Sequence, residues 1–173
     1  MHVKLLASIL IFAIAVSTVG AVNSTQTALA WLHANQQPSG AIVDAQYSEM
    51  HSAYAAIAFA ALEGASSASS QSSGSFAASK LNDSSAWFYG AWGEADVPSL
   101  LLWGATASGQ LPLVNTTLVA NELNSFRNDS SGGFRGYYDS NAGGAVESAA
   151  DTALAAIALS KANLLGSNAS SAI

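Results

Sequence analysis

A short apolar motif occurs twice in this chain, and its spacing limits the folds that the chain can adopt. The sequence Ala-Ala-Ile-Ala at Ala55–Ala58 recurs at Ala155–Ala158, 100 residues later. Gly40 and Gly90, each in a break that precedes a helix pattern, are 50 residues apart. A period of this length with two helices per unit is typical of stacked αα-hairpins, none of which buries its apolar face alone. The sequence therefore predicts an all-α fold of three αα-hairpin repeats of about 50 residues.

The third repeat shows the unit most clearly. Residues 131–139 read Ser-Gly-Gly-Phe-Arg-Gly-Tyr-Tyr-Asp, a glycine-aromatic loop, and a helix pattern follows it to Ala162. Ser148 and Asp151 have the spacing of a capping box, with Asp in place of the usual Glu or Gln. In the second repeat Asp96 precedes Pro98, which predicts an N-cap with proline in the first turn.

Further helix boundaries follow from the 3.6-residue periodicity of apolar side chains. A first helix is expected to begin near Ser24 or Thr25, and a second to run from Ser48 to Gly64. Residues 66–75 are dominated by serine and are expected to form an unfolded linker. Three large aromatic residues lie on apolar stripes and are predicted to belong to the core: Trp31, Tyr54 and Trp103.

The N-terminus reads as a secretory signal peptide over residues 1–21. Lys4 precedes an apolar run over residues 5–16, and Val19-Gly20-Ala21 supplies the small residues of a cleavage site. An uncleaved anchor, or the apolar stem of a pilin-like subunit, is the alternative. The repeat domain is then expected over residues 22–165, with a frayed tail at residues 166–173.

The composition excludes several classes of function. The chain has no cysteine, so disulfides, cysteine nucleophiles and thiolate zinc sites are ruled out together. Five lysines and arginines against 11 aspartates and glutamates give a net charge of -6, and no basic cluster is present. Phosphate recognition needs a basic face, so no nucleic-acid partner is expected.

A second feature supports export. The chain contains five Asn-x-Ser/Thr sequons without proline, which predict N-glycosylation in a host of archaeal or eukaryotic type. The predicted acceptors are Asn23, Asn82, Asn115, Asn128 and Asn168. The protein is therefore expected to be secreted or to lie at the cell surface.

The repeat resembles that of the prenyltransferase and squalene-cyclase family of α/α-toroids. The matching loops are Gln37–Ile42 and Ser131–Phe134; the matching helix starts are Asp151–Ala155 and, more loosely, Ser52–Ala55. The resemblance covers roughly residues 25–163. It implies a partial toroid, because a complete ring of that family contains more hairpins than the three expected here. A second copy of the chain is one way to complete the ring.

The resemblance also implies where a site lies, because it places the inner-helix N-termini and their loops around the mouth of a cavity. Aromatic residues expected to bind a ligand there are Trp87, Tyr89, Trp92, Phe134, Tyr137 and Tyr138. If the protein is an enzyme, Asp96 or Asp151 is the expected acid. However, the Asp-x-Asp-Asp acid motif of the cyclases and the zinc-ligand cysteine of the protein prenyltransferases are both absent. No metal and no cofactor are predicted.

These observations favour a non-catalytic function. The first hypothesis is an exported, glycosylated binding or envelope-associated module that takes a glycan, a lipid or a protein at its aromatic loops. The alternative is a divergent terpenoid cyclase, lyase or prenyl-chain enzyme. The third hypothesis is a surface-layer or filament subunit.

Overall fold

The computed structural model describes residues 24–42, 48–83, 94–139, 141 and 144–165. The chain divides into two compact units, residues 1–35 and residues 36–173, which are described separately below. The predicted signal segment, residues 1–21, and the predicted tail, residues 166–173, lie outside the described residues. Among the described residues, no helix combines the length and the apolar character needed to cross a membrane.

Residues 24–35 of the first unit are helical, and because residues 1–23 lie outside the described residues, the helix start near Ser24 or Thr25 stays a prediction. Asn35 lies in its last turn, where its side-chain amide donates a hydrogen bond to the Trp31 carbonyl over 2.8 Å. Trp31 itself is 59 % exposed, so its predicted place in the core is wrong. A single amphipathic stripe does not specify what covers it, because the covering surface comes from elsewhere in the fold.

The second unit is mostly helical, as predicted, with one small sheet. Its elements in chain order are α2 (Ser48–Glu63), α3 (Ala68–Leu81), α4 (Asp96–Ala107), a 3₁₀ helix (Leu111–Leu113), α5 (Thr116–Ser125), β1 (Arg135–Asp139), β2 (Gly144–Glu147) and α6 (Ala149–Lys161). The strands β1 and β2 pair antiparallel, with Arg135 opposite Glu147 and Tyr137 opposite Val146. This hairpin was not predicted, because the glycines of its sequence indicate a loop.

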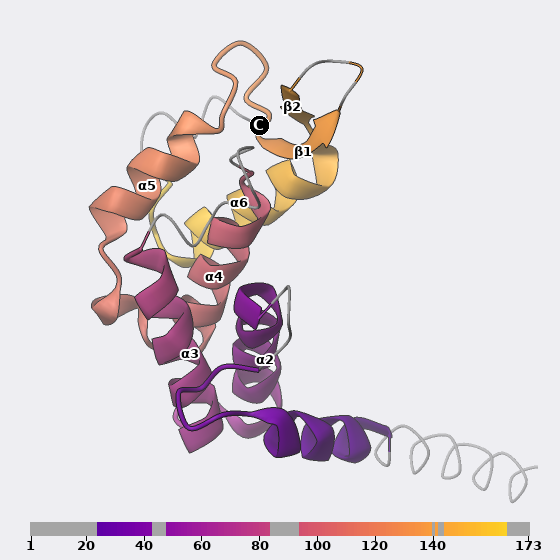
Figure 1. Cartoon of the computed structure of the whole chain (residues 1–173). Coiled ribbons are helices and arrows are strands. Elements are labelled where there is room, and N and C mark those ends of the chain that lie inside the picture. The colour runs from indigo at the N-terminus through magenta and orange to yellow at the C-terminus, as the bar shows by residue number, and fades with distance from the viewer. Residues whose placement is uncertain (1–23, 43–47, 84–93, 140, 142–143, 166–173) are drawn as a thin grey trace, which may run out of the picture. The chain divides into compact units, whose positions relative to one another are not determined.

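Helix α4 lies at the centre of the second unit, between α2 and α3 on one side and α5 and α6 on the other (Figure 1). Its sequence is apolar nearly all round, which predicts burial on most sides, and the structure confirms this. Leu100, Leu101 and Leu102 are all buried, although they point in different directions around the helix. They share one core with Leu123 of α5 and Leu159 of α6.

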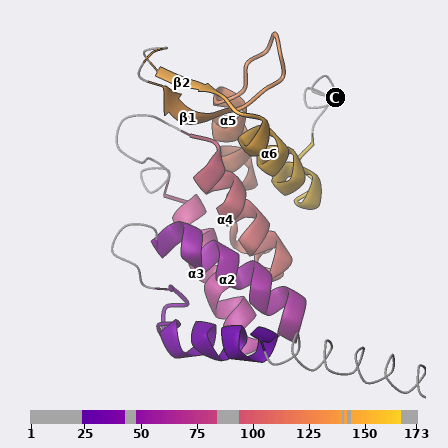
Figure 2. The ribbon, with the colours of Figure 1, turned by 90° about the vertical axis from the view of Figure 1, so that its right-hand side faces the viewer.

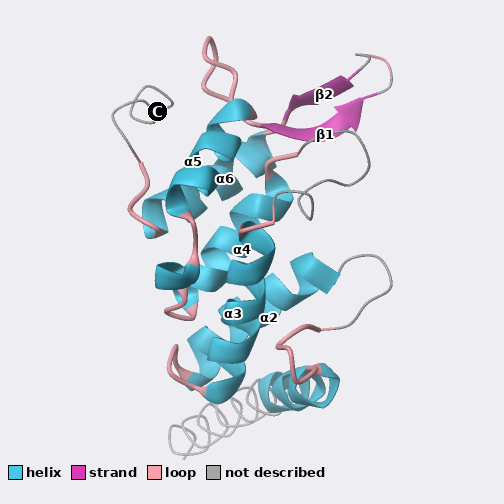
Figure 3. Cartoon of the chain, turned by 60° about the vertical axis from the view of Figure 1, so that its left-hand side comes forward, coloured by secondary structure: helices cyan, strands magenta, loops and turns pink. Residues whose placement is uncertain are grey.

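The hairpin lies at the end of the unit where α6 begins (Figure 2). The strands are thus confined to one end, away from α2 and α3 (Figure 3). Both strands are linked to the start of a helix. β2 is followed directly by α6, and the Ala95 N–H, just before α4, donates to the carbonyl of Arg135 in β1 over 3.0 Å. The N-terminal ends of α4 and α6 therefore lie near the same hairpin.

The serine-rich segment is helical, so the prediction of an unfolded linker is wrong. The predicted linker at residues 66–75 lies largely within α3, whose N-cap Ser67 accepts a hydrogen bond from the Ser70 N–H over 3.2 Å. The Ser73 hydroxyl donates to the Gly40 carbonyl over 2.8 Å and accepts from the Gln36 amide over 2.7 Å. Serine has no strong intrinsic preference for a helix, so these contacts with another segment, invisible in the composition, order the helix.

Two tight turns, 36–42 and 127–134, resemble one another, although the second is one residue longer. In each, a glycine adopts a positive φ that other residues avoid, +88° at Gly40 and +77° at Gly132. Isolated antiparallel bridges close both turns, joining Gln36 to Ile42 and Arg127 to Phe134. These turns contain the two loops, Gln37–Ile42 and Ser131–Phe134, on which the resemblance to the toroid family partly rests.

The residue that ends each turn is held by a hydroxyl of the following helix. The Ile42 N–H donates to Ser52 Oγ over 2.8 Å, and the Phe134 N–H donates to Thr152 Oγ1 over 2.9 Å. Ser52 and Thr152 are 100 residues apart, the separation of the repeated Ala-Ala-Ile-Ala motif. The corresponding loop of the second predicted repeat, residues 84–93, lies outside the described residues.

Candidate functional site

The candidate site lies around the hairpin, where the N-terminal ends of α4 and α6 and the turn after α5 meet. Of the aromatic residues predicted to bind a ligand, Trp87, Tyr89 and Trp92 lie outside the described residues. Tyr137 and Tyr138 lie in β1, where their backbones pair with Val146 and Ala145 of β2.

Phe134 is a correction. It is 4 % exposed and belongs to the shared core beside Phe126. Its N–H is held by Thr152, so the backbone that carries it is fixed against α6. A buried ring in a packed core offers no surface to an external ligand. Phe134 therefore anchors the turn to the core and does not contact a ligand.

The structure brings together Asp96 and Asp151, the two carboxylates that the sequence offered as acids, with Glu94 as a third. Burial raises the pKa of Asp96, and the nearby charge of Asp151 raises it further, against hydrogen bonds that lower it. Burial also raises the pKa of Glu94, with smaller contributions from Asp96 and Asp151. The segment 94–96 is held close to the hairpin by the hydrogen bond from Ala95 to Arg135.

Asp96 is not the N-cap of α4. That position belongs to Ala95, which makes no side-chain capping bond, and Asp96 is the first residue of the helix. Its Oδ1 accepts a hydrogen bond from the Val97 N–H over 2.6 Å. Asp96 thus bonds the residue next to it in the first turn, where a negative charge still interacts favourably with the helix dipole.

The predicted capping box of α6 forms only in part. Ser148 is the N-cap, and its hydroxyl accepts from the Asp151 N–H over 3.4 Å. The reciprocal bond is replaced, because the Ser148 N–H donates to the Phe134 carbonyl over 3.1 Å. The Asp151 carboxylate instead packs against Gly136, where an added Cβ would lie 1.7 Å from Oδ2. Gly136 also marks the register shift in β1, so its missing side chain makes room for the acid.

Glu147, at the end of β2, has a different environment. It is exposed, and its carboxylate accepts hydrogen bonds from the Ser131 hydroxyl over 2.5 Å and from the Asn128 side-chain amide. These two bonds lower the pKa of Glu147 below its ordinary value. Glu147 is therefore ionised at neutral pH, whereas Asp96 and Glu94 resist ionisation.

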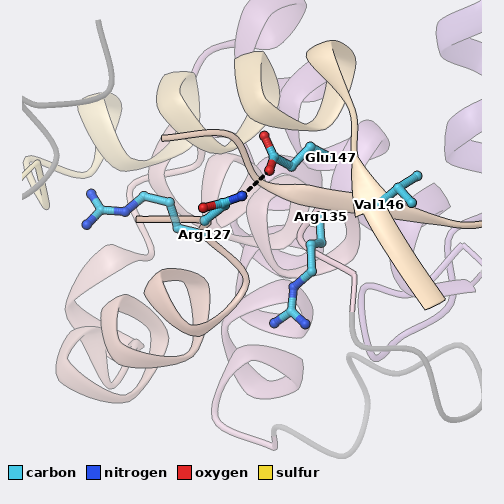
Figure 4. Close-up of a pocket in the computed structure, with 5 residues that line it drawn as sticks. Arg127, Arg135, Val146 and Glu147 are labelled. Carbon is cyan, nitrogen blue, oxygen red and sulfur yellow. Dashed lines mark hydrogen bonds between the residues drawn. The ribbon is translucent and has the colours of Figure 1, made fainter. Parts of the chain in front are cut away.

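A pocket of about 500 Å³ opens beside Glu147 (Figure 4). Its lining is formed by Arg127, Asn128, Arg135, Val146 and Glu147. Figure 4 shows the two arginine side chains pointing in different directions from the ribbon. The pocket is therefore lined by separate donor and acceptor groups on several sides, with no single focus of positive charge.

The two arginines are held in place by the chain. Arg127, with a side chain 11 % exposed, pairs with Asp129 over 3.3 Å between Nη2 and Oδ1. Arg135 donates from Nη2 to the Ser125 carbonyl over 2.6 Å and lies over the ring of Phe126, 5.9 Å from its centroid. These contacts fix the orientation of each guanidinium group beside the pocket.

Sequence reasoning missed both arginines and Val146 as site residues. The available signal was rarity, because Arg127 and Arg135 are two of only five basic residues in the chain and flank one glycine turn. Among the described residues, no cluster of three or more His, Asp or Glu side chains has the geometry to hold a metal ion. The carboxylates near α4 and α6 instead act on one another, because, in addition to burial, the charge of a neighbouring carboxylate raises the pKa of Glu94 and of Asp96.

Three of the predicted glycosylation acceptors are described, and all three are exposed: Asn82, Asn115 and Asn128. Asn82 donates from Nδ2 to the Leu113 carbonyl over 2.9 Å, and Asn128 donates to Glu147. Asn115 is the N-cap of α5 and accepts from the Leu118 N–H over 3.1 Å through Oδ1. A glycan on Asn115 keeps that capping oxygen, because the sugar is attached at the nitrogen. Asn23 and Asn168 lie outside the described residues.

Comparisons of this chain with protein-family models, with curated proteins and with solved structures gave no match.

Proposed function

We propose that this chain is an exported, glycosylated and non-catalytic binding module that takes a glycan at the hairpin. The observation that carries the proposal is the pocket beside Glu147, four of whose five lining residues have polar side chains. Sugar hydroxyls both donate and accept hydrogen bonds, so they match a pocket that offers guanidinium donors together with an ionised carboxylate. A lipid tail would form no hydrogen bonds with those polar groups.

The fold part of the proposal is a partial α/α-toroid of three αα-hairpin repeats, of the prenyltransferase and squalene-cyclase type. The shared turn geometry of residues 36–42 and 127–134 supports it, as do the two hydroxyls that hold those turns. In this arrangement the loops before the inner helices carry the ligand site, which is where the pocket and the aromatic residues 87–92 and 137–138 belong.

The binding test combines a glycan panel with variants of the pocket. Glu147→Gln removes a charge while keeping the shape, Arg135→Gln removes the guanidinium group, and each should weaken binding of the best glycan by at least about tenfold, or about 1.4 kcal/mol. Lys80→Gln, on α3, is the control and should bind normally. Unchanged affinity in both pocket variants would reject this site, and replacing Tyr137 and Tyr138 with Ala tests the aromatic contribution separately.

Export and glycosylation are tested on protein recovered from its native host. We expect the mature chain to begin near Val22. Its intact mass should exceed the mass of that polypeptide. Treatment with an N-glycosidase should remove the excess. A mass that retains residues 5–16 would instead support an anchored or filament-forming protein.

A second function, a divergent cyclase, lyase or prenyl-chain enzyme, is favoured by one observation. Asp96 lies close enough to Asp151 for their charges to interact, and its raised pKa favours the protonated form that a general acid needs. This hypothesis predicts that Asp96→Asn abolishes turnover of a prenyl substrate while the protein stays folded. Absence of turnover by the wild-type protein with a range of prenyl diphosphates would reject it.

A further inference from the structure

The helices α2 and α6 correspond residue by residue at a separation of 100. Ser52 and Thr152 hold equivalent turns, and the motif that follows them, Ala-Ala-Ile-Ala, is identical. The surroundings of equivalent residues on the two helices can therefore be compared directly. The comparison separates the residues that contact α4 from those that are exposed.

One face of α2 packs on α4. Ala53 belongs to the shared core, and Met50 and Ile57 pack against it. These positions, at i, i+3 and i+7, lie on one side of a helix. Gly104 of α4 comes so close to Ala53 that a Cβ added there would lie 3.4 Å from the Ala53 Cβ. This face of α2 therefore forms its contact with α4.

The equivalent face of α6 is uncovered. Ala150, Ala153 and Ile157 stand 100 residues after Met50, Ala53 and Ile57, and all three are exposed. Ile157 is 42 % exposed, which is unusual for a large apolar side chain in the middle of a helix. Helix α6 therefore exposes a face equivalent to the face of α2 that packs on α4, and no helix among the described residues covers it.

The opposite face shows the reverse relation. On α6, Ala158 and Ala162 are in the core with α4, and Leu154 packs against it. On α2 the equivalent residues are Tyr54, Ala58 and Leu62. Tyr54 is 54 % exposed and Leu62 is 51 % exposed, so the predicted place of Tyr54 in the core is wrong for this chain by itself.

Helices α2 and α6, which lie on either side of α4, thus expose complementary halves of one internal contact. Stacked repeats normally end in units with a polar outer face, because an apolar end recruits another surface. Here the two ends carry an isoleucine with alanines on α6, and a tyrosine with a leucine on α2. If the stack of helices continued, the exposed face of α6 would pack against a face like the exposed face of α2.

We propose that a second copy of this chain covers these faces, with the α6 face of one copy (Ala150, Ala153 and Ile157) bound to the α2 face of the next (Tyr54, Ala58 and Leu62). The contact is head-to-tail, so it either closes after two copies or extends into a longer assembly. The proposal rests on the repeat part of the proposed function and is independent of the glycan pocket, which lies on the hairpin.

The test uses two charged variants of the full chain and sedimentation velocity. Ala153→Glu/Ile157→Glu damages the α6 face, and Tyr54→Glu/Leu62→Glu damages the α2 face. We expect the wild-type protein to associate and each variant alone to stay monomeric. An equal mixture of the two variants should form a dimer, because one intact α6 face and one intact α2 face remain. Gln71→Glu and Asn121→Glu, at exposed positions of α3 and α5, are the controls and should associate like the wild type.

Several outcomes would overturn the proposal. These are a wild-type protein that stays monomeric at millimolar concentration, a variant that still associates alone, and a mixture that does not pair. An intrachain cross-link from position 54 to the helix at residues 24–35 in the monomer would show that the chain covers its own α2 face. If circular dichroism shows that a charged variant is unfolded, Ile157→Ala and Tyr54→Ala replace it, and each should weaken association about tenfold. Glycan binding by a monomeric protein would leave the proposed function intact while rejecting this assembly.

Discussion

At the scale of single residues, the ionisation of Asp96 controls part of the pH dependence of stability. Burial and the charge of Asp151 raise its pKa in the folded protein above the ordinary value, which the unfolded chain retains. Between the ordinary and the raised pKa, the folded state binds more protons than the unfolded state. The free energy of unfolding therefore falls as pH rises through this window, and ionised Asp96 costs stability at neutral pH.

We accordingly expect Asp96→Asn to raise the free energy of unfolding at neutral pH and to flatten its dependence on pH in the mildly acidic range. Urea denaturation at a series of pH values measures both effects. Glu63→Gln, an exposed carboxylate at the end of α2, is the matched control and should leave the slope unchanged. Loss of stability at neutral pH would mean that the hydrogen bond from Val97 to the carboxylate outweighs its burial.

Thr152 gives a second prediction at this scale, because its hydroxyl is the acceptor for the Phe134 N–H. Thr152→Val keeps the shape of the side chain and removes the acceptor, leaving a partly buried N–H without its partner. We expect a loss of about 1–3 kcal/mol in the free energy of unfolding. Thr152→Ser keeps the hydroxyl and should recover most of it. Unchanged stability in Thr152→Val, with a loss in Thr152→Ser, would show that the methyl group and not the hydrogen bond matters.

At the scale of elements, the hairpin and α6 fit together through a glycine. A side chain at position 136 would overlap the Asp151 carboxylate, so Gly136→Ala must displace the acid or the strand. We expect it to cost about 1–3 kcal/mol in the free energy of unfolding. The matched control is Gly144→Ala in the partner strand, where an added Cβ meets no atom within 4 Å. It should change stability by less than about 0.5 kcal/mol, and equal effects would contradict the close fit at Gly136.

The elements also differ in how far the sequence predicts them. The approximate positions of α2, α4 and α6 follow from their apolar patterns and cap residues, because these signals lie within each segment. The serine-rich first half of helix α3 could not be found in that way, since its buried positions include Ser70, Ser73 and Gly74. Its order depends on hydrogen bonds to residues 36 and 40, which are far away in the sequence.

At the scale of the whole molecule, charge opposes the association that we propose. Each copy carries a formal net charge of -6, so two copies repel one another at low ionic strength. The proposed contact faces contain no charged residue. We therefore expect association to strengthen as salt screens the repulsion, and sedimentation velocity at increasing sodium chloride concentration measures this. Association that weakens with salt would indicate an interface built on opposite charges instead.

The sequence by itself determined the helical character, the approximate positions of α2, α4 and α6, and the separation of 100 residues that relates α2 to α6. These features are local or periodic, so they can be read without knowing what each segment contacts. The sequence also offered Asp96 and Asp151 as alternative acids, but gave no reason for them to be neighbours.

Only the tertiary structure decided the rest. It placed Glu94 beside those two acids, made Phe134 part of the core, assembled the pocket around Arg127 and Arg135, and left Ile157 exposed. Each of these outcomes depends on which distant segment lies against a residue. Periodicity and composition describe a segment alone, whereas burial, pKa and pocket geometry are properties of the surfaces that the fold brings together.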